Sequence, residues 1–218
     1  MKFRVIITLL ILFGIFLNAS GAFSQERKKL PIPGLYNTGV DNNKYPIADG
    51  ETDPHYFLST SADAGFPGPD VKVVYTGAFP IGPWIQNDNE SKWIAPRADA
   101  GEFNAPGVYV YTLVFSLDGF KPETAEIRGY WTSDNNGSGI MINGSITDNF
   151  SPYNAFESGL FPFEIKEGLG FRAGTNSISF IVFNGEAPTG LRVVIYGEAE
   201  PIDVASLHSS DDSKSSDE

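Results

Sequence analysis

Residues 107–117 read "GVYVYTLVFSL" and show the strictest alternation in the chain. Successive side chains of a strand point to opposite faces of a sheet. The period of two therefore predicts a β-strand with one aromatic and aliphatic face in the core. That face consists of Tyr109, Tyr111, Leu113, Phe115 and Leu117. Another layer of structure must cover it, so the stretch requires a second sheet or a barrel wall.

Eight further segments have strand length and strand-like composition, and turn residues separate them. They cover residues 55–61, 71–77, 91–96, 124–134, 138–144, 160–166, 176–184 and 190–199. No segment shows a sustained helical period. Many strands separated by glycine, proline and asparagine are typical of an all-β sandwich or barrel. We expect an all-β fold, an antiparallel β-sandwich of jelly-roll type.

Two pairs of neighbouring segments resemble hairpins. Residues 134–139, "DNNGSG", contain the asparagine and glycine that tight turns favour, so segments 124–134 and 138–144 are predicted to pair. The loop "NGEAPTG" similarly predicts that segments 176–184 and 190–199 are antiparallel neighbours. The second faces of these last two segments are partly apolar, which indicates that loops cover one side of a sheet.

The two ends of the chain differ from its body. Lys2 and Arg4 precede an apolar run and then small residues, which predicts a signal peptide over residues 1–24. The run is short for a membrane-spanning helix, so an uncleaved anchor is the alternative. Residues 25–33 form a leader, residues 34–200 the sandwich domain, and residues 201–218 an acidic, serine-rich tail expected to be disordered. The expected location is secreted, or periplasmic or extracellular.

Composition excludes several classes of function. The chain has no cysteine, which excludes disulfides and thiolate metal sites. Its formal net charge is −12, and loss of Lys2 and Arg4 with residues 1–24 leaves −14. Nucleic acids and anionic membranes require a basic surface, so neither is an expected partner. No membrane insertion is expected after signal cleavage.

The sequence offers little for catalysis. Of its two histidines, His208 lies in the tail, so a Ser-His-Asp triad would have to use His55, which follows Pro54 at a strand entry and is interpreted as structural. The G-x-S-x-G motif is absent. The carboxylates that a glycosidase could recruit are unpaired and interpreted as solvated surface charges: Glu102, Glu126, Asp134 and Glu164. We therefore expect no enzyme.

A metal site in this chain would use oxygen ligands, which suit calcium. Two groups could supply them: Asp41, Asp49 and Asp53 in one region, and Asp134, Asn135 and Asn136 in another. The first spacing is not that of an EF-hand loop, and Asp-Gly and Asp-Pro pairs are also ordinary turn residues. Structural calcium and simple turn formation are both open interpretations, and no other cofactor is expected.

Aromatic and amide side chains near the predicted loops indicate ligand binding. An aromatic ring can cover the apolar face of a sugar while short polar side chains bind its hydroxyl groups. Trp131, Asp134, Asn135 and Asn136 offer this combination, and Trp84, Trp93 and Tyr153 are expected as secondary contacts. In the alternative interpretation, Trp131 packs in the core, with Gly129 leaving room for its ring, and Trp84 and Trp93 close the end of the sandwich.

Two stretches of the sequence resemble a known fold family. Residues 109–145 pass through "GYWTSD" to "IMING", and residues 161–199 contain "FPFEI" and "AGTNSISFIVFN". This order resembles the galactose-binding-like jelly roll, as in the sugar-binding domain of family-two glycoside hydrolases and related carbohydrate-binding modules. Their "LNG" turn and "G-x-N-x-[LI]" strand start are matched at residues 142–144 and 174–178. Trp131 and Asp134 match the family pattern, and the catalytic acids of those enzymes belong to another domain.

A closer resemblance, over about residues 34–199, is to an uncharacterised family of exported bacterial proteins that often carry a Pro-Glu-Pro sorting signal. It rests on "GLYNTGVDNNKYPIADGETDPHYFL", "WIAP" and "TGLRV"; the sorting signal itself is missing. Together these observations predict an exported, non-catalytic module that binds carbohydrate or a cell-surface polysaccharide. A structural or protein-interaction module of the cell surface or matrix is the alternative, and a glycan-active hydrolase is less expected.

Overall fold

The computed structural model describes residues 28–203. The predicted signal peptide, the first residues of the leader and the predicted tail beyond residue 203 lie outside the described residues. At the start of that tail, Pro201 bridges to Phe120 and the Ile202 N–H donates to the Gly119 carbonyl. Over residues 28–203, no helix has the length and apolar composition that crossing a membrane would require.

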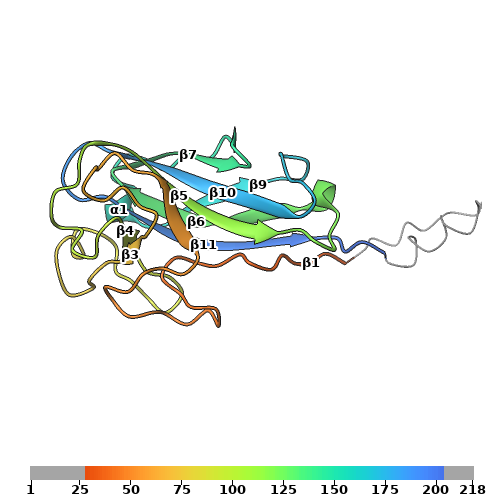
Figure 1. Cartoon of the computed structure of the whole chain (residues 1–218), viewed down its shortest axis with the longest axis horizontal. Helices are drawn as coiled ribbons and strands as arrows, with labels where there is room; N and C mark the ends of the chain where they lie inside the picture. Colours follow the sequence, from red (N-terminus) through yellow and green to blue (C-terminus); the bar gives the residue numbers. More distant parts are fainter. Residues whose placement is uncertain (1–27, 204–218) are drawn as a thin grey trace, which may run out of the picture.

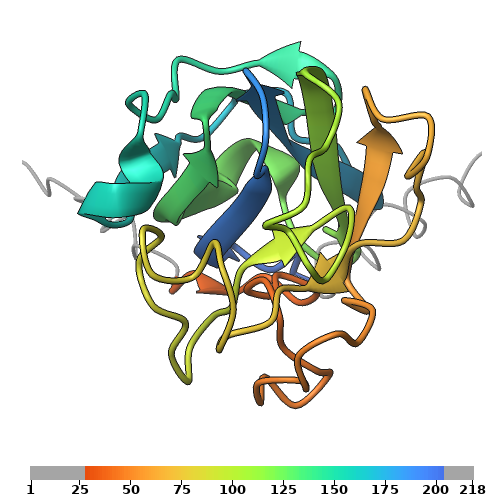
Figure 2. The same ribbon diagram turned by 90° about the vertical axis from the view of Figure 1, so that its left-hand side faces the viewer.

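Two antiparallel sheets pack face to face, which confirms an all-β antiparallel sandwich (Figures 1 and 2). The first sheet has the order β3-β4-β11-β6-β9, with β1 beside β11. Its strands are β1 (Leu30–Pro31), β3 (Lys72–Val73), β4 (Ile94–Ala95), β6 (Glu126–Asp134), β9 (Phe161–Ile165) and β11 (Gly190–Ala199). The second sheet, of order β2-β5-β10-β7-β8, contains β2 (Tyr56–Thr60), β5 (Gly107–Ser116), β7 (Asn136–Ile142), β8 (Ser145–Ile146) and β10 (Thr175–Asn184).

Each predicted segment overlaps a strand, but segments 71–77 and 91–96 form only two residues of strand each, β3 and β4. β1 and β8 are equally short and were not predicted from the sequence. The 3-10 helix η1 (Pro122–Thr124) and the one-turn helix α1 (Ala155–Ser158) were not predicted either. Elements this short have too few residues to show a period.

The main core lies between the sheets and includes the inward face of residues 107–117. The side chains predicted to face inward are each at most 3% exposed: Tyr109, Tyr111, Leu113, Phe115 and Leu117. Phe180 of β10 meets the rings of Trp131 and Phe163 from the other sheet, at centroid distances of 5.5 and 5.7 Å. Burying one such aromatic side chain contributes about 2–3 kcal/mol, so these contacts between layers are a main source of stability.

Consecutive long strands alternate between the two sheets, and this overturns both predicted hairpins. β6 pairs with β11 and β9, whereas β7 pairs with β10 and β8 in the other sheet. β10 and β11 likewise lie in different sheets. Both loops therefore carry the chain across the sandwich. The tight turn of this region is at Asn143 and Gly144, between β7 and β8, where φ is 50° and 83°, as a two-residue hairpin turn requires.

Loops cover the outer side of the first sheet at one end, as the apolar second face of segment 190–199 suggested. Arg192 of β11 is 2% exposed, and its guanidinium donates to Ser91 Oγ at 2.8 Å and to the Gln86 carbonyl. It also pairs with Asp88 at 2.5 Å. These bonds hold segment 84–93 on the sheet. A second hydrophobic cluster forms there from Val74, Trp84, Trp93, Ala95, Ala100 and Phe156.

Candidate functional site

Trp131, the first predicted ligand contact, lies in the main core with no exposed surface. Its ring occupies the space beside Gly137 of β7, where an added Cβ would lie 2.2 Å from Trp131 Cη2. The predicted partner, Gly129, makes room for Phe163 instead. The interpretation of Trp131 as a core residue is confirmed, and we do not retain its ring as a ligand surface.

Trp84 and Trp93 belong to the second hydrophobic cluster and are 1% and 0% exposed. Their ring centroids lie 4.2 Å apart, and Trp93 Nε1 donates to the Ile85 carbonyl at 2.9 Å. Both rings therefore pack at the end of the sandwich, as in the alternative interpretation. Neither presents a face to a ligand.

Asp134 is not the solvated surface charge that its polar sequence context suggested. It ends β6 and is 4% exposed, and its Oδ2 accepts a hydrogen bond from Trp84 Nε1 at 2.7 Å. Its buried Oδ1 has no hydrogen-bond partner among the described residues. Burial raises the pKa of Asp134 to about 7; the bond from Trp84 opposes this rise and the Glu157 carboxylate adds to it.

The remaining predicted contacts are at least partly exposed. Asn135 Oδ1 accepts the Gly185 N–H at 2.6 Å, and Asn136 Nδ2 donates to Ser138 Oγ at 3.3 Å. Tyr153, in the loop before α1, is 67% exposed. The structure thus joins Asp134 to Trp84 but separates the aromatic residues, with Trp131 in the main core, Trp93 in the second cluster and Tyr153 at the surface.

The aspartates of the first candidate calcium group accept hydrogen bonds that shape their own loops. Asp53 is buried and accepts three backbone N–H groups at 2.6–2.9 Å. Asp41 accepts two, and Asp49 accepts the Thr76 N–H and pairs with Lys92 at 2.7 Å. In the part of the chain that the structure describes, no group of three His, Cys, Asp or Glu side chains is placed to hold a metal ion.

His55, the histidine that a triad would require, stacks on Tyr36 with the ring centroids 3.5 Å apart and the planes 2° from parallel. This contact joins the loop after β1 to the entry of β2. It gives His55 a structural role at that junction.

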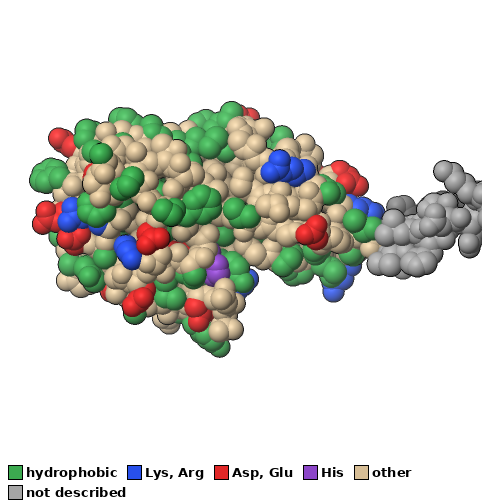
Figure 3. Space-filling model, viewed as in Figure 1, with side chains coloured by type: hydrophobic (Ala, Val, Ile, Leu, Met, Phe, Trp, Pro, Cys, Tyr) green, Lys and Arg blue, Asp and Glu red, His purple; other side chains and the backbone are tan. Residues whose placement is uncertain are grey.

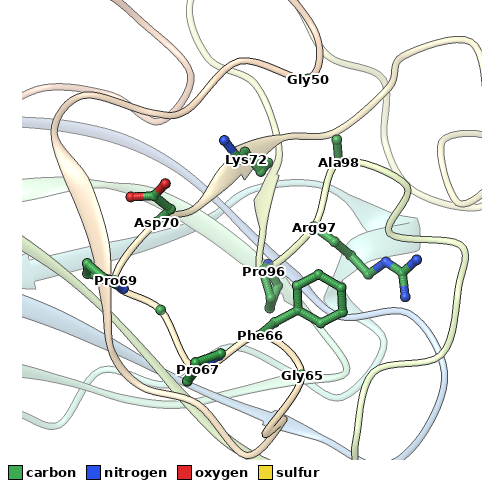
Figure 4. A pocket seen from close by; sticks show the side chains of 11 residues that line it. Gly50, Gly65, Phe66, Pro67, Pro69, Asp70, Lys72, Pro96, Arg97 and Ala98 are labelled. Carbon is green, nitrogen blue, oxygen red and sulfur yellow. The ribbon is translucent and has the colours of Figure 1, made fainter.

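A groove of about 500 Å³, which the sequence did not predict, opens beside β3 and β4 (Figure 4). Residues 65–70, Lys72 and residues 96–98 line it, and Gly50 completes the wall. Pairing of β3 with β4 fixes two of these segments. The third is tied to β2, because the Leu58 N–H donates to the Pro69 carbonyl at 2.8 Å. Gly68 has φ +87°, and an added Cβ there would lie 2.8 Å from the Leu58 carbonyl oxygen.

The groove combines an apolar wall with charged groups. Figure 4 shows Phe66 and three prolines around it, with the side chains of Asp70 and Lys72 on one side. The Arg97 guanidinium packs over the Phe66 ring, with its Cζ 4.8 Å from the ring centroid. Two hydrogen bonds to Asp99, at 2.6 and 3.0 Å, hold the guanidinium in this position. Lys72 donates to Thr52 and keeps further N–H groups. An ammonium donor and a carboxylate acceptor beside an aromatic ring can hold a ligand that carries hydroxyl groups.

The clue in the sequence was "GFPGPD" at residues 65–70, which places a large aromatic residue between glycine and proline in a loop. A turn would also use these residues. The groove becomes visible only when residues 96–98 are known to lie beside this loop.

Comparisons with known proteins assign no family. No protein-family model matches the chain, and no curated protein matches it. Among solved structures, the chain is similar to part of the GH31 alpha-xylosidase from Xanthomonas citri, with 11% sequence identity and a TM-score of 0.21. The match covers 80% of this chain, and the chain spans only 19% of the xylosidase chain.

Proposed function

We propose that this protein is an exported, non-catalytic binding module that recognises carbohydrate, such as a cell-surface polysaccharide, in the groove beside Phe66. The supporting observation is the composition of the groove, in which an apolar wall meets the carboxylate of Asp70 and the ammonium group of Lys72. A sugar ring has apolar C–H faces and a rim of hydroxyl groups, and such a wall and rim match it. The acidity of the chain argues against nucleic acid as the ligand.

The proposal includes the finer fold assignment, a galactose-binding-like jelly roll. Its support is the alternation of β5, β6, β7, β9, β10 and β11 between the two sheets. In this proposal the predicted residues have divided roles. Asn135, Asn136 and Tyr153 are contacts at a second part of the loop surface, while Trp84, Trp93 and Asp134 support the loops from within and Trp131 packs in the main core.

A glycan array with the purified protein, followed by titration of the best polysaccharide, tests the proposal. Phe66→Ala removes the ring of the groove and is expected to weaken binding at least tenfold, about 1.4 kcal/mol. Phe103→Ala is the matched control, because Phe103 is 75% exposed and lies outside the residues that line the groove. Circular dichroism confirms that both variants fold.

Absence of binding to any polysaccharide would refute carbohydrate recognition. Equal losses in Phe66→Ala and Phe103→Ala would refute the groove as the site. If no glycan binds but a cell-surface protein is retained and is lost with Phe66→Ala, the groove belongs to the alternative function, a protein-interaction module.

A further inference from the structure

The outer face of the second sheet carries no ionisable side chain on its strands. Inward residues of these strands are fixed by the core, so the intervening residues face outward. The outward residues are Phe57, Ser59, Thr60, Val108, Val110, Thr112, Val114, Ser116, Asn136, Met141, Ile146, Thr175, Ser177, Ser179, Ile181 and Phe183. Apart from the amide of Asn136 at one end, all are apolar or bear only a hydroxyl group. Val108, Val114, Phe183 and Ile146 are 42–60% exposed, whereas Val110, Thr112 and Ser179 at the centre are 5–9% exposed, so the open apolar surface lies around a closely packed centre.

Register places these residues in continuous rows across the sheet. Phe57 lies opposite Thr112, Thr112 opposite Ser179, Ser179 opposite Met141, and Met141 opposite Ile146. In Figure 3 the surface in the middle of the molecule is mostly uncharged, with hydrophobic side chains scattered among other side chains and backbone. The face is therefore a neutral patch on an acidic protein.

The hydroxyl groups at the centre of the face satisfy one another. Thr112 Oγ1 lies 2.9 Å from Ser59 Oγ and 2.8 Å from Ser179 Oγ, which makes a chain of hydrogen bonds across three strands. Burying a polar group is costly when its hydrogen bonds are lost. Because Ser59, Thr112 and Ser179 keep their bonds to one another, and Ser59 Oγ also donates to the Val110 carbonyl, a partner that covers these three hydroxyl groups breaks none of their hydrogen bonds.

Unlike the outer face of the second sheet, the outer face of the first sheet carries charged side chains. Its corresponding positions include Arg128, Glu164 and Glu198, and Arg128 lies over the ring of Tyr196 with its Cζ 5.4 Å from the centroid. Segment 84–93 covers another part of that face. A neutral, uncovered surface is thus a property of the second sheet rather than of the sandwich as a whole.

We propose that the outer face of the second sheet is a contact surface for a second copy of this chain, related by a two-fold axis. Each copy carries a formal charge of −12, so two copies repel wherever their charged surfaces meet. On the neutral face they meet without burying a like-charge pair. A two-fold axis brings the same patch to itself, and the partner then presents the same apolar rows and satisfied hydroxyl groups.

The size of the face fits this occupant. β5 and β10 have ten residues each, β7 has seven and β2 has five. At ~3.4 Å per residue and ~4.8 Å between strands, these four neighbouring strands give a face of roughly 520 Å². Two such faces would bury about 1,000 Å², which is the smallest area expected of a specific protein interface.

Sedimentation velocity of the purified protein from about 1 to 100 μM, at 0.05 and 0.5 M NaCl, tests the proposal. We expect a concentration-dependent species with twice the mass of one chain. Salt screens the repulsion between the acidic copies, so the dimer fraction should rise with salt. An interface held by ion pairs would respond in the opposite direction.

Val114→Lys and Phe183→Lys each place a charge on the proposed surface, near its opposite ends, and should reduce the dimer fraction at least tenfold. Tyr130→Lys is the control, because Tyr130 is 43% exposed on the first sheet. A protein that stays monomeric at 100 μM in high salt refutes the proposal, including when this face instead binds a neutral polymer. A dimer that persists in both variants but is lost in Tyr130→Lys also refutes it. If either Val114→Lys or Phe183→Lys fails to fold, the other variant still tests the surface.

Discussion

The substitution Asp134→Asn tests whether the carboxyl beneath Trp84 is buried as the structure describes. Asparagine keeps an oxygen that can accept the 2.7 Å bond from Trp84 Nε1, and it removes the titration. The pKa of Asp134 is raised from 3.8 to about 7, mainly by burial. A raised carboxyl pKa means that the folded protein binds the proton more tightly than the unfolded chain does. The resulting stability is complete below the unfolded pKa and is lost as the pH rises through the folded pKa.

A shift of about three units corresponds to about 4 kcal/mol over the whole titration, at about 1.4 kcal/mol per unit. Between pH 5 and pH 8 the part that is lost is roughly 2–3 kcal/mol. The wild-type protein should therefore lose about this much stability relative to Asp134→Asn over that range. Taking the difference between the two proteins removes contributions from all other titrating groups. Asp49, Asp63, Asp88 and Asp99 in any case have lowered pKa values, so their effects fall at acid pH.

Urea unfolding at pH 5, 6.5 and 8, followed by tryptophan fluorescence, measures this difference, since Trp84 contacts the carboxyl directly. Glu157→Gln is a second probe, because the Glu157 charge contributes to the raised pKa of Asp134. Its removal should move the midpoint of the effect to lower pH. A free-energy difference between wild type and Asp134→Asn that stays constant from pH 5 to pH 8 would show that Asp134 is solvated, and the reasoning would fail.

Two further substitutions test the packing that holds the loops. Arg192→Lys should destabilise the fold by about 2–3 kcal/mol in urea unfolding, because lysine cannot reproduce the buried guanidinium bonds to Ser91 and Gln86; no loss would mean that segment 84–93 is held by its apolar contacts alone. Gly137→Ala should lower the free energy of unfolding by about 1–3 kcal/mol, since the added methyl group would overlap the Trp131 ring. Gly77→Ala, where an added Cβ meets nothing within 4 Å, should leave the melting temperature nearly unchanged, and equal effects in the two glycine variants would contradict the packing described.

The period of two identified the strands and their buried faces well. In β5 the predicted core side chains, from Tyr109 to Leu117, are all buried. The same pattern could not assign strands to sheets, because both layers of a sandwich bury the same kind of face. A loop such as residues 134–139 has the residues of a hairpin turn, but its chain crosses to the other sheet after a single residue, Asn135. Pairing depends on partners far along the chain, which local residues do not specify.

The site predictions failed for a related reason. Exposure of a tryptophan depends on the segments that cover it, and for Trp131 one of these is β7 at Gly137, in the opposite sheet. Asp134 has a polar sequence neighbourhood but is buried by Trp84, fifty positions away in the chain. The groove at Phe66 is missed because its walls come from separate segments. In each case the residue type was visible in the sequence and its surroundings were not.

The burial of Asp134 follows from the contact between two loops, the β6–β7 loop and the β10–β11 loop, each of which carries the chain from one sheet to the other. Its backbone carbonyl accepts a hydrogen bond from Thr189 Oγ1 at 2.8 Å, just before β11 begins. The next residue, Asn135, donates its N–H to the Phe183 carbonyl and accepts the Gly185 N–H, near the end of β10. The crossing from β6 to β7 is thus bonded to the crossing from β10 to β11. An alternating path between sheets brings these two loops to the same end of the sandwich, and the carboxyl of Asp134, which points outward from β6 there, is covered by segment 84–93. Ionisation of Asp134 therefore acts at the junction of both layers, where it destabilises the whole fold rather than a single loop.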